Sequence, residues 1–375
     1  MNNKKKYFTK RLLQWNIKNN NRPMPWKGEK DPYKIWLSEI ILQQTRVEQG
    51  WDYYKLFVAT FPTIDKLANA PENKVFKLWE GLGYYSRCKN LITTAKLISK
   101  EWNAKFPDKY KDILNLKGVG PYTAAAIASF AFNLPYAVVD GNVFRVLSRF
   151  FGNNTAIDST EGKKLFTNLA GELLDKKQPG IYNQALMDFG AVVCKPRLPL
   201  CKSCTLKSRC VAYLEGTVEI LPVKEKKILQ KNRWFYYVLA EFEGKILVRK
   251  RGAKDIWENL YEFILEEKQE EINLAVTGVN KLKGLTVLKE LSEKNKFTLQ
   301  CVSKKYRQKL THQTINGQFI KIKLQQLPNL RGYQPVSKKK LTALPFPKFI
   351  TTYLKDKNVS LNLIYVTHTV QIFKT

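Results

Sequence analysis

The sequence predicts a protein of two domains, an all-α domain followed by an α+β domain. Up to about residue 221, apolar residues recur at helical spacing, and the breaks between helical runs fall at proline and glycine. Beyond residue 232, runs rich in aromatic and β-branched residues are separated by turn residues, as strands are. A chain of 375 residues is long enough for two domains. We therefore expect an all-α domain over 1–221, a basic linker over 222–232 and an α+β domain over 233–355, with the tail 356–375 unassigned.

The chain is strongly basic. Lys and Arg number 64 against 32 Asp and Glu, which gives a formal net charge of +32. Such an excess indicates a polyanionic partner, either a nucleic acid or an anionic membrane surface. No apolar run is long enough to cross a membrane, and the Lys-rich N-terminus lacks the apolar core of a signal peptide. We therefore expect a cytosolic protein, in which the six cysteines need an explanation other than disulfides.

The first elements expected are a basic tip and a helix. Residues 1–6 are rich in lysine, and we expect them to be mobile. Residues 7–19 are expected to form an amphipathic helix. Its apolar face consists of Phe8, Leu12 and Trp15. Two prolines within residues 22–27 exclude a continuous helix there.

A second helix is expected over residues 32–46. Its spacing places Glu39 and Gln43 on one face. Further helices are expected between residues 51 and 115. Their breaks fall at 61–62, 70–71, 81–83 and 106–107. The remaining helices of the first domain are expected at 122–133, 142–151, 160–176 and 180–193.

The second domain is expected to begin with a β-hairpin. Residues 234–241 and 245–248 read as strands around a turn at Glu243 and Gly244. Two later segments alternate in the same way and are expected to be strands, 297–303 and 317–324. Residues 341–354 look helical at their end. No internal repeat is apparent.

A glycine turn separates two helices of the first domain. Gly118 and Gly120 permit a tight backbone turn, and Pro121 suits the first position of the helix that follows. The free N–H groups and the dipole at that helix start favour an anion, and nucleic-acid phosphate is the natural one. We therefore expect the hairpin at about 112–133 to bind DNA phosphate through Gly118 and Gly120. The alternative is a plain αα-corner with a glycine turn.

Four of the cysteines lie within 17 residues, with the spacing C-x6-C-x2-C-x5-C. They are Cys194, Cys201, Cys204 and Cys210. Such a cluster is typical of a metal site. Zinc sites usually combine two separated Cys-x2-Cys pairs, whereas one compact loop better suits an iron–sulfur cluster. A zinc site and buried free thiols remain the alternatives, and Cys88 and Cys301 are expected to be packing residues.

These features together resemble a known family. The glycine hairpin, Asp140 at 20 residues after Gly120, and the cysteine spacing are similar to the helix-hairpin-helix DNA glycosylases that carry a 4Fe–4S cluster. Within that superfamily, two motifs resemble the adenine DNA glycosylases of the MutY type. They are Ser38-Glu39-Ile40-Ile41-Leu42-Gln43-Gln44-Thr45 and Glu80-Gly81-Leu82-Gly83-Tyr84-Tyr85-Ser86-Arg87. This resemblance covers about 7–222 strongly and 233–350 more weakly.

The weaker part of the resemblance is to the family's Nudix-like C-terminal domain. It depends on Trp257-Glu258-Asn259-Leu260-Tyr261-Glu262-Phe263 and on Leu310-Thr311-His312. The Nudix hydrolase box is missing, because Glu270 and Glu271 stand without it. The resemblance therefore implies a helix-hairpin-helix glycosylase domain with a 4Fe–4S loop at 194–210, followed by a Nudix-like recognition domain.

The resemblance also implies an activity. A monomeric enzyme would flip adenine out of double-stranded DNA where it is mispaired with 8-oxoguanine or guanine. It would hydrolyse the N-glycosidic bond and leave an abasic site, in base excision repair at the nucleoid of a bacterial cytoplasm. Mismatch-repair or replication partners are not specified by the sequence.

Breaking this bond calls for one acid and one anion. The acid must stay protonated near neutral pH, so it needs apolar surroundings, and Glu39 has them. The resemblance implies that Glu39 protonates the adenine ring, whereas the alternative is a solvated helix glutamate. It also implies that Asp140 stabilises or traps the sugar cation, although Asp-Gly before a helix is commonly an N-cap. Asn142 is implied to support it.

Tyr122 decides the subclass within the resemblance. Relatives that resemble endonuclease III carry a lysine at this position, and its amine forms a Schiff base that leads to strand cleavage. A tyrosine cannot form that bond. The resemblance therefore implies base removal without efficient strand cleavage.

The remaining site residues are also implied by the resemblance. Those around the adenine pocket are Arg22, Trp26, Lys27 and Gln184. Lys27 and Gln184 replace an arginine and a glutamate of some members. Those that wedge into the duplex, which base flipping requires, are Gln44, Leu82 and Tyr84. Those near the damaged opposing base are Thr311 and His312. Core packing is the alternative for Leu82, and a structural role is the alternative for His312.

Two other functions compete with this one. The first is a related glycosylase that acts on thymine or another mispaired base, against which the second domain and the Glu39 motif argue. The second is a cluster-containing DNA-binding protein without catalysis. Its signature would be the loss of Glu39 or Asp140, and both residues are present.

Overall fold

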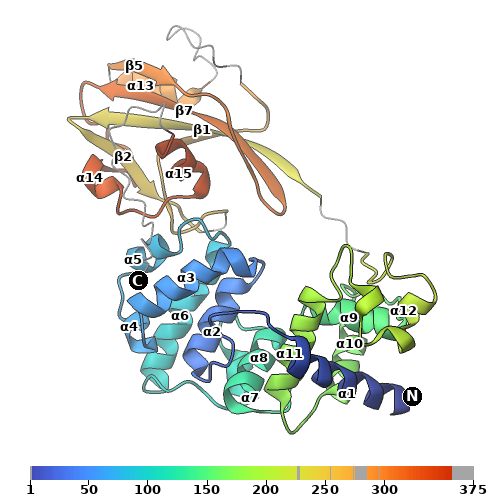
Figure 1. Ribbon diagram of the computed structural model, residues 1–375. Helices are drawn as coiled ribbons and strands as arrows, with labels where there is room; N and C mark the ends of the chain where they lie inside the picture. Colours follow the sequence, from blue (N-terminus) through green and yellow to red (C-terminus); the bar gives the residue numbers. More distant parts are fainter. Residues whose placement is uncertain are drawn as a thin grey trace, which may run out of the picture. The chain divides into compact units, whose positions relative to one another are not determined.

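The computed structural model describes residues 2–225, 229–253, 255–272, 274, 285–294 and 296–356. These residues divide into two compact units (Figure 1). Unit 1 comprises Met1–Ala70 and Arg87–Lys227, and unit 2 comprises Pro71–Ser86 and Ile228–Thr375. The predicted succession of an all-α part and an α+β part is confirmed. Within the described residues, no helix is both long and apolar enough to span a membrane. The predicted tail lies outside them, apart from residue 356.

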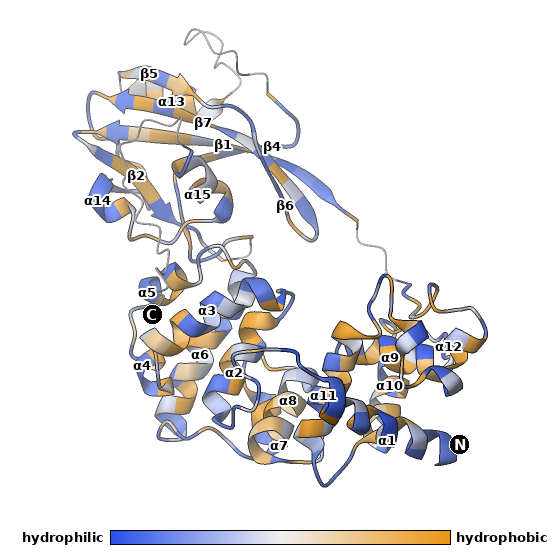
Figure 2. Ribbon diagram, viewed as in Figure 1, coloured by the Kyte–Doolittle hydropathy of each residue, from blue (hydrophilic) through white to orange (hydrophobic). Residues whose placement is uncertain are grey.

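The regular elements among the described residues of unit 1 are all helices, and the first two residues of one of them, α6, belong to unit 2. Its longer helices are α1 (Asn2–Asn19), α2 (Pro32–Leu42), α3 (Val47–Thr60), α6 (Tyr85–Glu101), α8 (Pro121–Phe132), α9 (Gly141–Phe151), α10 (Thr160–Leu173) and α11 (Pro179–Val192). Its short helices are α4 (Ile64–Ala68), α7 (Tyr110–Asn115), α12 (Val211–Leu214) and the 3-10 turns η1 (Cys201–Ser203) and η2 (Lys207–Arg209). Figure 2 shows apolar colour along α8, which packs between α2 and α11.

Helix α1 includes the basic tip, so the prediction of a mobile segment over 1–6 is wrong. The lysines of the tip have partners on neighbouring helices: Lys5 forms an ion pair with Glu172 of α10, and the Lys4 ammonium lies 5.3 Å from the centre of the Phe150 ring. These contacts extend the helix to Asn2. The predicted apolar face is confirmed, because Phe8, Leu12 and Trp15 are buried against α9, α10 and α11.

Helix α2 is a core helix that ends earlier than predicted. The Asp31 side chain accepts a hydrogen bond from Tyr33 N at 2.9 Å, and Pro32 occupies the first position, so the start is well defined. Eight residues of this helix are buried, among them Glu39. The helix ends at Leu42 instead of residue 46, because Gln44 has a left-handed backbone with φ 55°. This turn redirects the chain into α3.

Unit 2 contains an eight-stranded mixed sheet in the order β3-β2-β1-β7-β5. The other three strands pair with members of this path, β4 with β1, β6 with β7 and β8 with β2. The strands are β1 (Lys231–Phe242), β2 (Lys245–Lys250), β3 (Tyr261–Glu262), β4 (Ile264–Lys268), β5 (Phe297–Val302), β6 (Tyr306–Lys309), β7 (Gln313–Leu324) and β8 (Gln334–Ser337). The helices are α5 (Glu72–Leu78), α13 (Thr286–Lys294), α14 (Lys338–Leu341) and α15 (Lys348–Leu354).

The central strand β1 is buried on both faces. Tyr236, Val238 and Ala240 pack with Leu288 of α13, whereas Tyr237 on the other face stacks on Phe319, which in turn contacts α15. A strand covered on both sides reads as a continuous apolar run, as 234–240 does. The predicted hairpin is confirmed: β1 and β2 are antiparallel, and Glu243 and Gly244 form the turn with φ 46° and 73°.

Helix α5 and the loop after it belong to unit 2, although residues 87–227 separate them from the rest of that unit in the chain. Lys77 Nζ donates to Leu344 O at 3.1 Å, and Phe346 N donates to Glu80 Oε2 at 3.0 Å. Lys77 Nζ also lies 2.9 Å from Glu80 Oε2. Because these bonds join the family-like motif at 80–87 to the chain before α15, that motif is fixed by long-range contacts.

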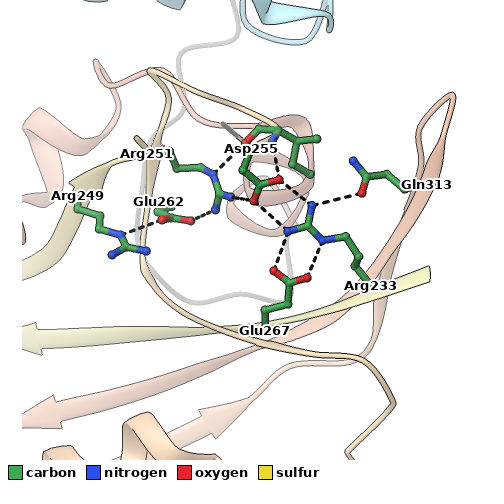
Figure 3. Close-up of polar contacts among 8 residues, drawn as sticks. Arg233, Arg249, Arg251, Asp255, Glu262, Glu267 and Gln313 are labelled. Atoms are coloured by element: carbon green, nitrogen blue, oxygen red, sulfur yellow. Dashed lines mark hydrogen bonds and ion pairs between the residues drawn. The ribbon is translucent and has the colours of Figure 1, made fainter. Parts of the chain in front are cut away.

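A charged network holds one end of the sheet of unit 2 (Figure 3). Glu262 is 1% exposed and binds Arg251 on one oxygen and Arg249 Nε at 2.9 Å on the other. Arg251 Nη2 continues to Asp255 Oδ2 at 2.7 Å. Arg233 donates hydrogen bonds to both Asp255 and Glu267. These hydrogen bonds raise the pKa of Arg233. The network is balanced in charge, and its inner carboxylate is fully buried.

We predict that Glu262→Gln lowers the free energy of unfolding of unit 2 by about 3 kcal/mol, because it removes the buried partner of Arg251, whose side chain is 7% exposed and then keeps only Asp255 as a counter-charge. Urea unfolding followed by circular dichroism measures the change. Glu267→Gln is the matched control: its side chain is 36% exposed, so a loss of at most ~1 kcal/mol is expected. Equal losses in the two variants would contradict a special role for the buried pair.

Candidate functional site

Glu39 lies at a cavity of unit 1. The cavity has a volume of about 230 Å³, and Trp26, Lys27, Ser38 and Gln184 line it together with Glu39. Helix α2 supplies Glu39 and Ser38, the loop before α2 supplies Trp26 and Lys27, and α11 supplies Gln184. Three of the four residues predicted around a pocket therefore do lie around one cavity with the predicted acid.

The environment of Glu39 favours its protonated form. Glu39 is 5% exposed, and burial raises the pKa of its carboxyl to about 7. A hydrogen bond from the Tyr122 hydroxyl lowers this pKa, and the nearby negative charge of Asp140 raises it. The carboxyl can therefore hold or release a proton near neutral pH. Three of the four side chains predicted as catalytic, Glu39, Tyr122 and Asp140, thus lie close enough to influence one another.

Asp140 begins helix α9 as its N-cap. Its Oδ1 accepts from Val143 N and its Oδ2 accepts from the Asn142 amide, both at 2.7 Å. Burial raises the pKa of Asp140, while these hydrogen bonds and the charge of Arg145 oppose that increase. Asp140 is thus the N-cap that the Asp-Gly pair indicates, a role compatible with the predicted catalytic one, and the cap fixes the carboxylate in one orientation. Asn142 supports Asp140 directly.

Arg145 extends this arrangement and was not foreseen from the sequence. Its Nη2 donates to Asn142 Oδ1 at 2.8 Å and to Gly190 O at 2.6 Å, and its Nε donates to Cys194 O at 2.7 Å. A chain of hydrogen bonds thus runs from the first clustered cysteine through Arg145 and Asn142 to Asp140. The only sequence signal is an arginine on the apolar face of a helix, where it needs buried acceptors.

Asp188 is a second residue that sequence reasoning missed. It lies on α11 and is fully buried, and Arg22 Nη1 donates to its Oδ1 at 2.9 Å. Arg22 does not itself line the cavity. It reaches the site through Asp188, which also accepts from Gln184 Nε2 at 3.0 Å. A helical spacing of four between Gln184 and Asp188 was the available signal.

The predicted wedge residues lie in two places. Gln44 is exposed at the turn after α2 in unit 1. Tyr84 is exposed in unit 2, and its hydroxyl shares a hydrogen bond with that of Thr311. Leu82 is 4% exposed, which agrees with the alternative that it is a core-packing residue. His312 is exposed, and its carbonyl accepts from Lys231 N at 3.0 Å. The structure thus brings Tyr84 and Thr311 together.

The glycine hairpin joins α7 to α8. Gly118 has φ +82°, a left-handed backbone that favours glycine, and a Cβ placed there would lie 2.8 Å from Asn90 Cβ. Gly120 is the N-cap of α8, with Pro121 at the first position. Gln43 Nε2 donates to Thr123 Oγ1 at 3.3 Å, which links the end of α2 to α8. The N–H groups at the start of α8 are therefore held in a defined loop.

Four thiols line one small cavity of about 30 Å³ in the loop after α11: those of Cys194, Cys201, Cys204 and Cys210. Burial and, to a smaller extent, the neighbouring thiols together raise the pKa of Cys204 to about 12. Arg149 Nη1 lies 3.5 Å from Cys194 Sγ, and Leu206 N lies 3.4 Å from Cys204 Sγ. In the described part of the chain, no group of three or more His, Cys, Asp or Glu is arranged to hold a single metal ion.

The two other cysteines differ from each other. Cys88 is buried, as expected for a packing residue. Cys301 is exposed on β5, so the packing prediction is wrong for it. It lies on an outer strand of the sheet path, where a side chain can face solvent.

The sequence matches two described families. Residues 37–171 match the family described as "HhH-GPD superfamily base excision DNA repair protein", and residues 235–356 match the NUDIX domain. Glu39, the hairpin and Asp140 all fall within the first match. The second match covers the sheet of unit 2 and the helices that follow it.

Several curated relatives are named adenine DNA glycosylase. That of Buchnera aphidicola subsp. Baizongia pistaciae is 36% identical over 290 residues, covering 76% of this chain and 82% of the relative. That of Arabidopsis thaliana is 33% identical over 292 residues, covering 67% of this chain and 46% of the relative. That of Homo sapiens is 39% identical over 214 residues, covering 55% of this chain and 39% of the relative.

Solved structures share the fold of the helical part. A thermostable thymine-DNA glycosylase has a TM-score of 0.53 at 30% identity and covers 57% of this chain and 98% of its own. A trapped endonuclease III–DNA covalent intermediate has a TM-score of 0.50 at 19% identity, and the match covers 56% of this chain and 96% of the endonuclease chain. The second likeness shows the fold alone.

Proposed function

Because the chain belongs to the adenine DNA glycosylase family of the HhH-GPD superfamily of base excision DNA repair proteins, we propose that it removes adenine from double-stranded DNA. The adenine is one that is mispaired with 8-oxoguanine or guanine. The enzyme flips the nucleotide out, hydrolyses the N-glycosidic bond and leaves an abasic site. It acts as a monomer in the bacterial cytoplasm, at the nucleoid.

One observation carries this proposal: Glu39 is a buried carboxyl with a pKa of about 7 at the edge of a cavity, with a second carboxylate, Asp140, nearby. The protonated Glu39 gives its proton to a ring nitrogen of adenine, so the base leaves as a neutral molecule. The Asp140 carboxylate stabilises the positive charge that develops on the sugar. Water then adds to the sugar carbon and releases a proton, which completes the hydrolysis.

Tyr122 supports base removal without strand cleavage. Its hydroxyl is held by Glu39 and burial raises its pKa well above the ordinary value, so it stays a neutral hydrogen-bond donor. It offers no amine for a Schiff base with the sugar. Its role in this mechanism is to orient the Glu39 carboxyl.

The test is a single-turnover assay on a set of duplexes. Each duplex carries adenine, thymine or cytosine opposite guanine or 8-oxoguanine, and alkali reveals abasic sites. We expect strand breaks after alkali for adenine only, and fastest opposite 8-oxoguanine. Faster removal of thymine than of adenine would contradict the proposal and favour a thymine-DNA glycosylase activity, as in the name of the similar solved structure. Breaks before alkali treatment would contradict the role given to Tyr122.

We further propose that Cys194, Cys201, Cys204 and Cys210 hold one 4Fe–4S cluster. The donor set fits: four sulfurs share one cavity, and N–H groups of Arg149 and Leu206 approach two of them, as is common around such clusters. The cluster would fix the loop at 194–210, which contains Cys194, whose carbonyl accepts a hydrogen bond from Arg145. Metal analysis and absorbance spectra of the purified protein test this: iron is expected, and zinc in equal amount to protein would contradict it.

We propose that the base opposite the adenine is recognised by Tyr84, Thr311 and His312. The support is that Tyr84 and Thr311 share a hydrogen bond within unit 2 and are accessible to a ligand. Gln44 supplies an exposed side chain for insertion into the duplex. Leu82 can insert only after leaving its buried position.

The hairpin of Gly118 and Gly120 is proposed to bind DNA phosphate. We predict that Gly118→Ala lowers affinity for duplex DNA about tenfold, because a left-handed alanine costs roughly 1–3 kcal/mol and its Cβ would displace Asn90. Fluorescence anisotropy at fixed salt measures the affinity. Gly171→Ala is the control, since Gly171 is helical with open space around it, and no loss is expected. Unchanged affinity in both variants would exclude this contact.

A further inference from the structure

The buried carboxylate of Asp188 has a full set of donors. Gln184 Nε2 and Arg22 Nη1 lie 3.0 and 2.9 Å from Oδ1, and Asn20 Nδ2 and Lys27 Nζ lie 2.9 and 3.5 Å from Oδ2. The donors come from α11 and from the loop that follows α1, segments more than 150 residues apart. With each oxygen held by two donors, the carboxylate has one orientation.

This carboxylate fixes the amide of Gln184. Gln184 Nε2 is the atom that faces Asp188 Oδ1, at 3.0 Å, since the amide NH2 group donates and a carboxylate oxygen accepts. The carbonyl oxygen is then the group that Gln184 offers to the cavity it lines with Glu39. Without this partner, the two ends of a glutamine amide are nearly equivalent in shape, and either could face the cavity.

We propose that Asp188 is a positioning residue for base selection: it makes the cavity present an acceptor, and so favours a purine with an amine at position 6 over one with an oxygen there. The inference rests on the proposed function. Adenine carries an amine that donates to the Gln184 oxygen, whereas hypoxanthine carries an oxygen that would face another oxygen. Both purines have the ring nitrogen that Glu39 protonates, so the chemistry of bond cleavage is the same.

Asp188→Asn changes this polarity while keeping the shape. With the new NH2 group in the place of Oδ1, the asparagine oxygen keeps Asn20 and Lys27, Arg22 loses its acceptor, and the NH2 group donates to the Gln184 oxygen. This turns the Gln184 amide and exposes its NH2 group to the cavity. The ratio of adenine to hypoxanthine excision rates is then expected to fall by about 5- to 100-fold, the effect of one mismatched buried hydrogen bond.

The experiment measures single-turnover excision of adenine and of hypoxanthine, each opposite 8-oxoguanine, by the full chain. Three proteins are compared: the parent, Asp188→Asn, and the double variant Asp188→Asn with Gln184→Glu. In the double variant a glutamate accepts from the new asparagine and again presents an acceptor, so the parent's preference is expected to return. A merely structural role for Asp188 would not predict this return.

The outcomes separate the two proposals. A parent that removes no adenine overturns the proposed function. A parent that removes adenine, with an Asp188→Asn variant that keeps the same ratio, overturns the positioning role alone. If circular dichroism shows that Asp188→Asn is unfolded, Gln184→Leu replaces it: this variant lacks both ends of the amide, so its ratio must also fall, and an unchanged ratio overturns the inference.

Discussion

Glu39→Gln is expected to lower the single-turnover rate of adenine excision at pH 7 by about 10²- to 10⁴-fold, the contribution of a general acid. Glutamine keeps the size of the side chain and can accept from the Tyr122 hydroxyl, but it has no proton to give. Binding to DNA should change little, because phosphate contacts of a basic protein supply most of the affinity. The measurement sets the excision rate beside the equilibrium affinity at the same salt concentration.

The pH dependence follows from the pKa of Glu39, which is about 7 in the folded protein against an ordinary value of 4.5. The rate of the parent should fall as pH rises through about 7, as the acid loses its proton. The folded state binds this proton more tightly than the unfolded chain, so the associated stability is present below about pH 4.5 and lost as pH rises to about 7.

Glutamine is neutral at all these pH values, so Glu39→Gln should stabilise the fold at pH 8 by up to ~3 kcal/mol while it lowers the excision rate. Unfolding in urea at pH 5 and pH 8 measures this. Glu161→Gln, an exposed helix glutamate, is the control with no expected change in either property. A Glu39→Gln protein that excises at the parent's rate would remove the acid from the mechanism.

Asp140→Asn is expected to lower the excision rate by about 10²- to 10³-fold, because the sugar cation loses its anionic partner. Asparagine is as good an N-cap as aspartate, and its oxygen can still accept from Val143 N, so α9 should be retained. Burial raises the pKa of Asp140, so the parent's rate should also fall at low pH, beginning at a higher pH than an ordinary aspartate would cause.

The control for Asp140→Asn is the same substitution at another helix start. Asp31 caps α2 through a bond from Tyr33 N at 2.9 Å. Asp31→Asn removes a charge from an N-cap in the same unit, so it should leave the rate close to that of the parent. If both variants lost activity to the same extent, Asp140 would act only as a cap.

The sequence predicted most elements whose signal is local. The stripe of Phe8, Leu12 and Trp15 gave the first helix, and the aromatic run at 234–240 gave the central strand. The short strands β4, β6 and β8 were missed because their few residues carry no clear alternation. The basic tip of α1 was misjudged because its order comes from contacts with α9 and α10, far away in the chain.

The predicted acid, its cavity neighbours and the anion came from motifs, and the structure places Glu39, Tyr122 and Asp140 close together. Arg145 and Asp188 could not be found in that way. Each is a buried charged residue on a helix, and its partners are known only once the chain has folded. The contact of Tyr84 with Thr311 joins residues 227 positions apart, which no local pattern reveals.

The parallel pairing of β1 with β7 bears on how the protein is made. Lys231 pairs with Gln313, so the ribosome must add 82 further residues before the partner of β1 exists. At about 5–20 residues per second this takes roughly 4–16 s. During that time the run of aromatic and aliphatic residues at 234–240 lacks its parallel neighbour β7, and such a segment readily associates with other chains. The yield of soluble protein should therefore be limited by unit 2, and slower synthesis or a chaperone that covers this strand should raise it.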